Sequence, residues 1–265
     1  MIPRLFIDAS LEAGAGAPLT AEQAHYLKNV LRRAAGDDLR LFNGRDGEFA
    51  ATIAELKKKG GVAAVHTQTR IHEPEPDLWL CFAPVKRGPL ETIVQKAVEI
   101  GVARLIPVST ERTVASKLNI QRLQVIVLEA AEQCGRLTVP SVSEPIKLNA
   151  LIEGWPADRR LIFCDEAGDN ENEEWGGPDG RAVPLLEALT DADSKADDRV
   201  NNWRAEKSAI VTGPEGGFAP SERKYLRSQD FVTAATLGPR ILRADTAAIA
   251  ALVLWQAARG DWRKK

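Results

Sequence analysis

Two glycine-rich segments stand near the C-terminal end of the chain, and each separates a strand-like run from a helix-like run. The first is Thr212-Gly213-Pro214-Glu215-Gly216-Gly217-Phe218, and the second is Leu237-Gly238-Pro239-Arg240-Ile241-Leu242-Arg243. In parallel sheets, ligands bind at the carboxyl ends of strands, where such loops gather. Glycine lets the backbone approach a ligand closely, and its exposed amide can donate a hydrogen bond. The two segments therefore predict a ligand site, although two tight turns without a ligand would show the same pattern.

The chain from residue 78 onward alternates between strand-like and helix-like runs. Apolar residues recur at helical spacing from Pro89 to Ile100, and Gly101 is expected to close that helix. A second helix is expected over Leu118 to Cys134. The strand-like runs lie at Leu78–Pro84, Leu105–Ser109, Leu161–Cys164, Ser208–Thr212 and Val232–Leu237. This alternation predicts an α/β fold with a mostly parallel sheet and helices on both faces.

The last helix is expected to begin at about Thr246. It contains an unbroken apolar run of nine residues, Ala247 to Trp255. A helix that is apolar on all sides is buried, and the partner can be the core of the same chain or another subunit.

The first 72 residues have a different pattern, with short strands separated by turn dipeptides. Thr20 and Gln23 form a capping box that starts one helix, whose apolar stripe is Leu27, Val30 and Leu31. Glycine-containing turns then separate three strand-like runs, which predicts a small β-barrel. The stiff, polar segment Glu73-Pro74-Glu75-Pro76 marks the domain boundary. The three strand-like runs are Leu39–Phe42, Glu48–Leu56 and Val62–Thr69.

Composition argues against a membrane-spanning, a disulfide-bonded or a metal-binding protein. Apolar residues make up 44% and charged residues 27% of the 265 positions, as in soluble globular proteins. There is no apolar run of the roughly 18 residues that a membrane span needs. The three cysteines and three histidines lie far apart, which argues against disulfides and against a metal site. We expect a cytoplasmic protein without a metal.

The net charge of −2 conceals an uneven distribution. Residues 165–206 contain 13 acidic and 4 basic side chains, whereas the rest of the chain contains 31 basic and 24 acidic ones. Residues 168–206 are interpreted as an exposed acidic insertion. The remaining basic body suits a polyanionic partner.

The two glycine segments differ from the known phosphate-binding motifs. Neither matches the GxGxxG fingerprint or the phosphate loop that ends in Gly-Lys-Ser/Thr. Glu215 would also repel a phosphate group. A ligand with a positive centre fits better, and S-adenosylmethionine carries a sulfonium and an ammonium group but no phosphate.

Nearly the whole chain resembles the RsmE-type 16S rRNA uracil-N3 methyltransferases of the SPOUT superfamily. Besides the two glycine segments, the motifs that carry the resemblance are His25-Tyr26-Leu27 through Val30-Leu31-Arg32, Gly36-Asp37, Leu41-Phe42-Asn43-Gly44, Gln95-Lys96-Ala97-Val98-Glu99-Ile100-Gly101-Val102, Pro107, Glu111-Arg112, Glu129-Ala130-Ala131-Glu132-Gln133-Cys134-Gly135-Arg136 and Pro140. Three features depart from the family pattern. Ala244-Asp245 replaces the usual Thr-Glu, with Asp245 expected to cap the last helix; Gly88-Pro89 opens its helix differently; and the acidic insertion is longer.

The resemblance implies a fold, a cofactor and partners. The fold is a PUA-like β-barrel domain over residues 1–72, followed by a SPOUT methyltransferase domain with a C-terminal trefoil knot over residues 73–265. The cofactor is S-adenosylmethionine, and the substrate is a uridine of 16S rRNA in the small ribosomal subunit. Members of the superfamily act as homodimers, and nothing in the resemblance implies a metal or a membrane.

Methylation at N3 of uracil requires stabilisation of negative charge on the base, which an arginine can supply. Arg243 is the first candidate and Arg136 the second; an ion pair with Glu132 or Glu129 is the alternative for Arg136. The helix pattern places Glu129, Glu132, Gln133 and Arg136 on one face. Glu215 is a candidate proton acceptor or cation partner, with capping of nearby amides as its alternative.

The remaining candidate residues form two sets. For donor binding these are Cys164, Gly213, Glu215, Gly216, Gly217, Leu237, Gly238, Ile241 and Leu242, and the loop after Cys164 is expected to complete the pocket. For RNA binding they are Arg32, Arg33, Arg45, Lys86, Arg87 and Arg112.

Three other functions stay open on the residues alone. A SPOUT enzyme that methylates a ribose 2′-hydroxyl would share both loops. A dinucleotide-dependent oxidoreductase would need the missing phosphate fingerprint. A non-catalytic RNA-binding protein would keep the basic residues and lose the donor site.

Overall fold

The computed structural model describes residues 2–114, 118–165, 182–190 and 207–262. The chain divides into two compact units. Unit 1 comprises Met1–Pro74 together with Leu128–Val139, and unit 2 comprises Glu75–Val127 and Pro140–Lys265. Most of the acidic insertion expected at 168–206 lies outside the described residues. Within it, β11 (Val183–Pro184) and α5 (Leu185–Thr190) are described.

Unit 1 is built on a five-stranded sheet with the order β1-β3-β4-β5-β2. All pairings are antiparallel except that of β1 with β3. Alternate apolar side chains of the strands face a core that includes the fully buried Leu39, Leu41 and Ile53. The strands are β1 (Arg4–Phe6), β2 (Gly16–Leu19), β3 (Asp38–Phe42), β4 (Glu48–Lys57) and β5 (Gly60–Arg70).

The first helix is shorter than predicted. Its capping box is present, because Thr20 Oγ1 accepts from the Gln23 amide at 3.2 Å and Gln23 Oε1 from the Thr20 amide at 2.9 Å. After α1 (Ala21–His25) the chain continues as the π-helical turn η1 (Tyr26–Val30). Its wider i to i+5 spacing changes which side chains share a face. The predicted apolar stripe was therefore wrong for Val30, which is 60% exposed.

The C-terminal part of α3 (Ile120–Cys134) belongs to unit 1. Arg4 donates from Nη1 to the Ala131 carbonyl at 2.8 Å, from Nη2 to the Arg136 carbonyl, and from Nε to Glu48 at 2.6 Å. Gly135, with φ +81°, ends the helix. Arg136 consequently lies beyond the helical residues, and the prediction that it shares a helix face with Glu132 was wrong.

Glu132 is a partly buried carboxyl group in unit 1. Burial raises the pKa of Glu132 to about 7, although the Phe6 amide, 3.0 Å from Oε1, and the Arg4 guanidinium both favour the charged form. The folded state therefore binds a proton more tightly than the unfolded chain does. Between about pH 4.5 and 7, this residue makes stability fall as the pH rises.

Glu132→Gln is expected to flatten this decline, because glutamine keeps an acceptor for the Phe6 amide and carries no charge to desolvate. The variant should gain stability relative to the wild type above pH 7, by an upper limit of about 3 kcal/mol. Urea unfolding at pH 5 and pH 8 measures the difference. Parallel curves for the two proteins would contradict this role, and Glu12→Gln, at an exposed position of the same unit, is the control.

Unit 2 is built on a parallel sheet with the order β11-β13-β10-β12-β6-β7-β8, and β9 pairs with β7. Every pairing is parallel, so the α/β prediction is confirmed. Central strands are buried on both faces, which explains their continuous apolar runs. The strands are β6 (Leu78–Phe82), β7 (Arg104–Ser109), β8 (Ser141–Val142), β9 (Ile146–Lys147), β10 (Arg159–Cys164), β12 (Lys207–Thr212) and β13 (Val232–Thr236).

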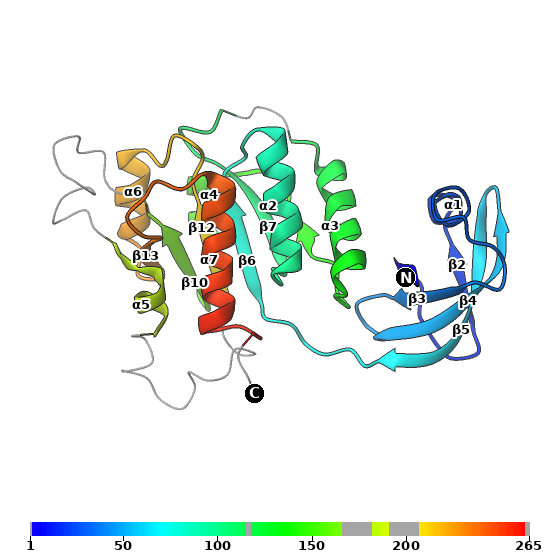
Figure 1. Cartoon of the computed structure of the whole chain (residues 1–265). Coiled ribbons are helices and arrows are strands. Elements are labelled where there is room, and N and C mark those ends of the chain that lie inside the picture. The colour runs from blue at the N-terminus through cyan, green and yellow to red at the C-terminus, as the bar shows by residue number, and fades with distance from the viewer. Residues whose placement is uncertain (1, 115–117, 166–181, 191–206, 263–265) are drawn as a thin grey trace. The chain divides into compact units, whose positions relative to one another are not determined.

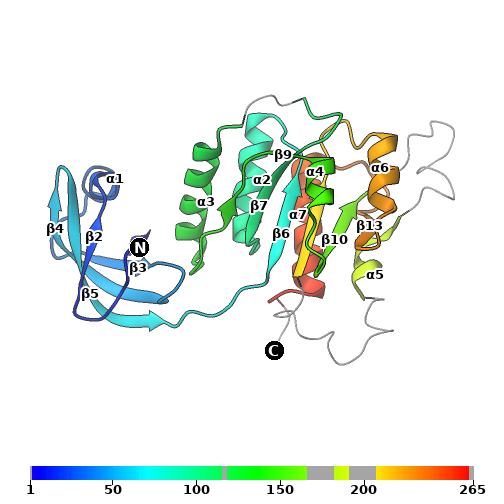
Figure 2. The same ribbon diagram turned by 180° about the vertical axis from the view of Figure 1, so that it is seen from behind.

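Helices cover both faces of this sheet. Helices α2 (Arg87–Glu99) and α7 (Ala244–Ala258) pack side by side on one face (Figure 1). Helix α4 (Leu148–Glu153) lies on the opposite face (Figure 2), where it shares a core with α6 (Pro220–Arg227).

Helix α7 begins two residues earlier than predicted. Its N-cap residue is Arg243, whose carbonyl accepts from the Ala247 amide at 2.8 Å. Asp245 therefore lies in the first turn, where its Oδ1 accepts from the Thr246 amide at 2.8 Å, and the prediction that Asp245 caps the helix was wrong. A carboxylate there still interacts favourably with the helix dipole.

Candidate active site

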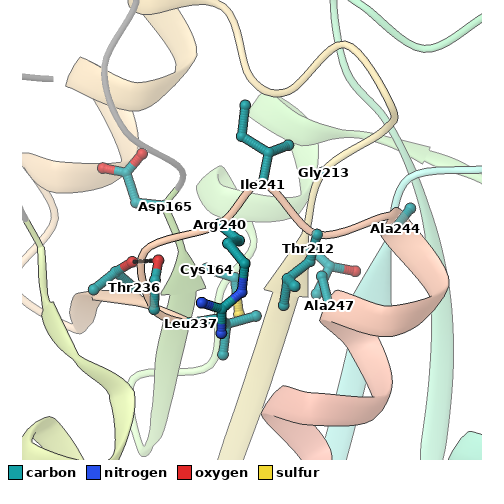
Figure 3. A pocket seen from close by; sticks show the side chains of 12 residues that line it. Cys164, Asp165, Thr212, Gly213, Thr236, Leu237, Arg240, Ile241, Ala244 and Ala247 are labelled. Atoms are coloured by element: carbon teal, nitrogen blue, oxygen red, sulfur yellow. Dashed lines mark hydrogen bonds between the residues drawn. The ribbon is translucent and has the colours of Figure 1, made fainter. Parts of the chain in front are cut away.

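Three neighbouring parallel strands, β13, β10 and β12, end at the same edge of the sheet. Their last residues, Thr236, Cys164 and Thr212, line one pocket together with residues of both glycine turns (Figure 3). The pocket has about 500 Å³ of empty space, a volume that includes the solvent at its open mouth. The other lining residues are Asp165, Gly213, Leu237, Gly238, Arg240, Ile241, Leu242, Ala244 and Ala247.

The first glycine turn is held against the sheet by Phe218. The ring of Phe218 meets that of Phe163 edge to face, with centroids 4.9 Å apart. A Cβ atom on Gly213 would lie 2.8 Å from the Phe218 ring. Glycine at this position therefore lets the ring pack while the backbone borders the pocket.

The second turn needs glycine for a different reason. Gly238 has φ +106°, a left-handed conformation that other residues adopt only with strain. The space beside its Cα is open, since a Cβ atom added there would meet no described atom within 4 Å. The Thr236 hydroxyl donates to the Gly238 carbonyl at 3.4 Å (Figure 3).

Two buried polar side chains of the pocket, Thr212 and Asp165, differ in their hydrogen-bond partners. Thr212 Oγ1 is buried and has no hydrogen-bond partner among the described residues, which is costly unless a ligand or water supplies one. Asp165 is also buried, but Arg223 and Arg227 of α6 each donate an Nε–H to its carboxylate at 2.7 Å. The pocket thus presents an unsatisfied hydroxyl, which fits a polar ligand.

The predicted donor-binding residues divide into two groups. Six of them line the pocket: Cys164, Gly213, Leu237, Gly238, Ile241 and Leu242. Glu215, Gly216 and Gly217, in the middle of the first turn, do not line it. Glu215 instead lines a wider groove with Lys86 and Arg87.

The three candidate catalytic residues lie in different places. Arg243 is exposed and directly follows the pocket-lining Leu242. Arg136 belongs to unit 1, where its Nη2 donates to Thr138 Oγ1 at 3.1 Å. Glu215 is exposed and caps no amide of the described residues; Glu222 does so instead, accepting from the amides of Glu111 at 2.8 Å and Ala219 at 3.0 Å.

The candidate RNA-binding residues are distributed over both units. Arg32, Arg33 and Arg45 lie in unit 1, and Arg32 has φ +55° just after the π-helical turn. In unit 2, Arg112 is exposed and donates to the Gly216 carbonyl at 3.1 Å. Arg112 therefore contacts the first glycine turn. The same turn contributes Glu215 to the groove that Lys86 and Arg87 line.

Sequence reasoning missed several lining residues: Thr212, Thr236, Arg240, Ala244 and Ala247. Thr212 and Thr236 are the last residues of their strands, and a polar residue at a strand's carboxyl end is a usable signal. Asp165 begins the loop after Cys164, which was expected to complete the pocket, although the residue itself was grouped with the acidic residues that follow it. Arg240 stood inside the second turn, where Arg243 was the preferred candidate.

The described part of the chain can also be compared with the requirements of a metal site and of a membrane-spanning helix. Within those residues, no group of three or more His, Cys, Asp or Glu side chains could hold a metal ion. None of the described helices has the length and apolarity to cross a membrane.

Two family models match the chain. Residues 72–256 match the RNA methyltransferase domain, and residues 19–65 match the RNA methyltransferase PUA domain. The first match covers more than half of the sequence, so the chain belongs to this family of RNA methyltransferases.

Curated relatives and solved structures show which RNA methyltransferases the chain is similar to. The ribosomal RNA small subunit methyltransferase E of Rickettsia conorii is 30% identical over 250 residues, which span 94% of this chain and 93% of that protein. The enzyme of the same name from Bacillus subtilis is 27% identical over 94% of each chain. A crystal structure of ribosomal RNA small subunit methyltransferase E from Neisseria gonorrhoeae, bound to S-adenosyl methionine, matches with a TM-score of 0.78 and 27% identity, covering 99% of this chain and 100% of that one. The predicted resemblance is confirmed.

Proposed function

We propose that this protein transfers a methyl group from S-adenosylmethionine to N3 of a specific uridine of 16S rRNA in the small ribosomal subunit. The observation that carries the proposal is the pocket at the ends of β10, β12 and β13, bordered by both glycine turns. Relatives named for methylation of small-subunit rRNA, and one of them bound to the donor, support it.

The donor site is the pocket itself. Leu237, Ile241 and Leu242 supply an apolar wall for the adenine ring, and the backbones of Gly213 and Gly238 allow close approach. Thr212 Oγ1 gains a hydrogen-bond partner that the described residues do not supply. When bound, the donor supplies an electrophilic methyl group on a cationic sulfur.

The protein's contribution is orientation and charge stabilisation. N3 of uracil must lose its proton to become a nucleophile, and the negative charge then spreads onto O2 and O4. Arg243, which follows the pocket-lining Leu242, is the first candidate to stabilise that charge, and Arg136 is the second. Holding acceptor and donor in line contributes on the order of 7–11 kcal/mol. Glu215, exposed and unpaired among the described residues, is a candidate acceptor for the proton.

The proposal extends to the fold and the assembly. We assign residues 1–72 to a PUA-like β-barrel and residues 73–265 to a SPOUT domain with a C-terminal trefoil knot. The partly buried apolar side chains of Ile249, Val253 and Leu254 on α7 suit a homodimer interface. Arg32, Arg33, Arg45, Lys86, Arg87 and Arg112 are the candidate contacts to RNA phosphates. A protein with this substrate acts in the cytoplasm.

Calorimetric titration with S-adenosylmethionine tests the class of function. Binding with micromolar to submillimolar affinity is expected; absence of binding at millimolar donor would exclude a methyltransferase and leave a non-catalytic RNA-binding protein. Leu242→Asp, which places a charge in the adenine wall, should abolish binding. Lys224→Asp on α6 is a charge-changing control that does not line the pocket.

The target atom is tested on rRNA from a strain that lacks this protein. Mass spectrometry should show N3-methyluridine disappearing from 16S rRNA and returning when the gene is restored. Loss of a ribose 2′-O-methyl group instead, with N3-methyluridine unchanged, would favour the alternative SPOUT chemistry.

A further inference from the structure

Arg240 is a cation whose side chain lies in the donor pocket without a partner among the described residues. It lines the pocket, and Figure 3 shows its guanidinium directed into the space bordered by Cys164 and Leu237. Within the part of the chain that the structure describes, no hydrogen bond or ion pair reaches Arg240. Arg240 is exposed at the wall of the pocket, so the five donors of its guanidinium are available to a ligand.

The other charged side chain of the pocket is already neutralised. Asp165 lies between Arg223 and Arg227, and its side chain is only 1% exposed. Among the described residues that line the pocket, Arg240 is therefore the charged side chain that has no partner of opposite charge. The first turn of α7, which contains the lining residues Ala244 and Ala247, adds positive potential from the helix dipole.

This potential conflicts with two of the donor's three charges. The sulfonium and ammonium groups of S-adenosylmethionine are positive, and only its carboxylate is negative. A guanidinium pairs with a carboxylate through two parallel hydrogen bonds, which no other group of the donor can accept so well. On the basis of the proposed function, we propose that Arg240 binds the carboxylate of the donor and thereby selects donors that carry an intact amino-acid group.

The pairing of Arg240 with the carboxylate also orients the methyl group of the donor. Anchoring the carboxylate at Arg240 fixes one end of the flexible amino-acid chain, and the apolar wall at Leu242 fixes the adenine at the other end of the donor. The sulfur between them is then restricted in position, which is what in-line transfer requires. Arg240 acts in binding and positioning, whereas Arg243 acts on the acceptor.

The test compares two ligands that differ only in the carboxylate. Wild-type protein and Arg240→Gln are titrated with S-adenosylmethionine and with its decarboxylated form, by calorimetry. The wild type should prefer the intact donor by about 10- to 100-fold, the size expected for a charge-assisted pair. Arg240→Gln should lose that preference, with its affinity for the decarboxylated form unchanged or improved. Arg240→Lys should retain part of it.

Arg160→Gln is the matched control, because Arg160 is exposed and lies at the opposite end of β10 from the pocket. It should keep the wild-type preference. Circular dichroism melting of each variant checks that the fold is intact.

The outcomes separate this inference from the proposed function. If the wild type binds neither ligand, the methyltransferase function fails. If the wild type binds the donor and Arg240→Gln keeps the full preference for the carboxylate, only the inference is overturned. Unchanged donor affinity combined with a raised KM for RNA would place Arg240 on a phosphate of the substrate, and this result also overturns it.

Discussion

Arg243→Ala is expected to lower the methyl-transfer rate by roughly 10²- to 10³-fold, the cost of removing one preorganised group that stabilises developing negative charge. The side chain is exposed and makes no hydrogen bond or ion pair among the described residues. Its removal should therefore leave folding intact. Because Arg243 does not line the donor pocket, the dissociation constant for S-adenosylmethionine should change by less than about twofold.

Single-turnover assays with small ribosomal subunits measure this rate without interference from product release. Arg243→Lys should recover part of the activity, since an ammonium carries the charge without the planar pair of donors. Arg160→Ala, at the far end of β10, should be as active as the wild type. A normal rate in Arg243→Ala would remove Arg243 from the chemical step and make Arg136 the leading candidate.

Trp255→Ala is expected to produce the largest loss of stability, about 3–5 kcal/mol, the range for truncating a fully buried aromatic residue. Trp255 is 0% exposed on α7, which packs against α2 and β12. Its indole nitrogen has no hydrogen-bond partner among the residues that the structure describes, so the lost contribution is packing. Trp255→Phe should cost less, because much of the ring volume is kept and no hydrogen bond is broken.

Urea unfolding followed by circular dichroism measures both variants. Trp262 provides a matched control in the same part of the chain: it is 53% exposed, and Trp262→Ala should change the unfolding free energy by no more than about 0.5 kcal/mol. Equal losses at the two positions would contradict the burial that the structure assigns to α7.

The parallel sheet could be predicted because its signals are local. Central strands such as β10 and β12 read as short apolar runs, and each is followed by a turn or helix signal within a few residues. Helix α2 was predicted from five apolar positions that are all buried in the structure. The failures occurred where local geometry departs from the regular period, as in the π-helical turn before Arg32.

The candidate site could be predicted only in part. Gly213 and Gly238 stood out, because glycine between a strand and a helix is informative in itself. Asp165 did not, since its burial depends on two arginines about 60 positions further along the chain. Arg240 and Arg243 are equivalent in the sequence, three residues apart in one turn. Only the path of that turn directs the first into the pocket and leaves the second outside it.

The two glycine turns and the strand–helix alternation were thus determined by the sequence alone. Each depends on residues within a dozen positions of one another, or on a whole-chain pattern of motifs. The tertiary structure decided which turn residues meet in one pocket, because β13, β10 and β12 are neighbours in the sheet although other elements separate them along the chain. It also decided the charge of that pocket, since burial and pairing neutralise Asp165 and leave Arg240 available. Burial and long-range pairing are properties of packing, and no local pattern of residues encodes them.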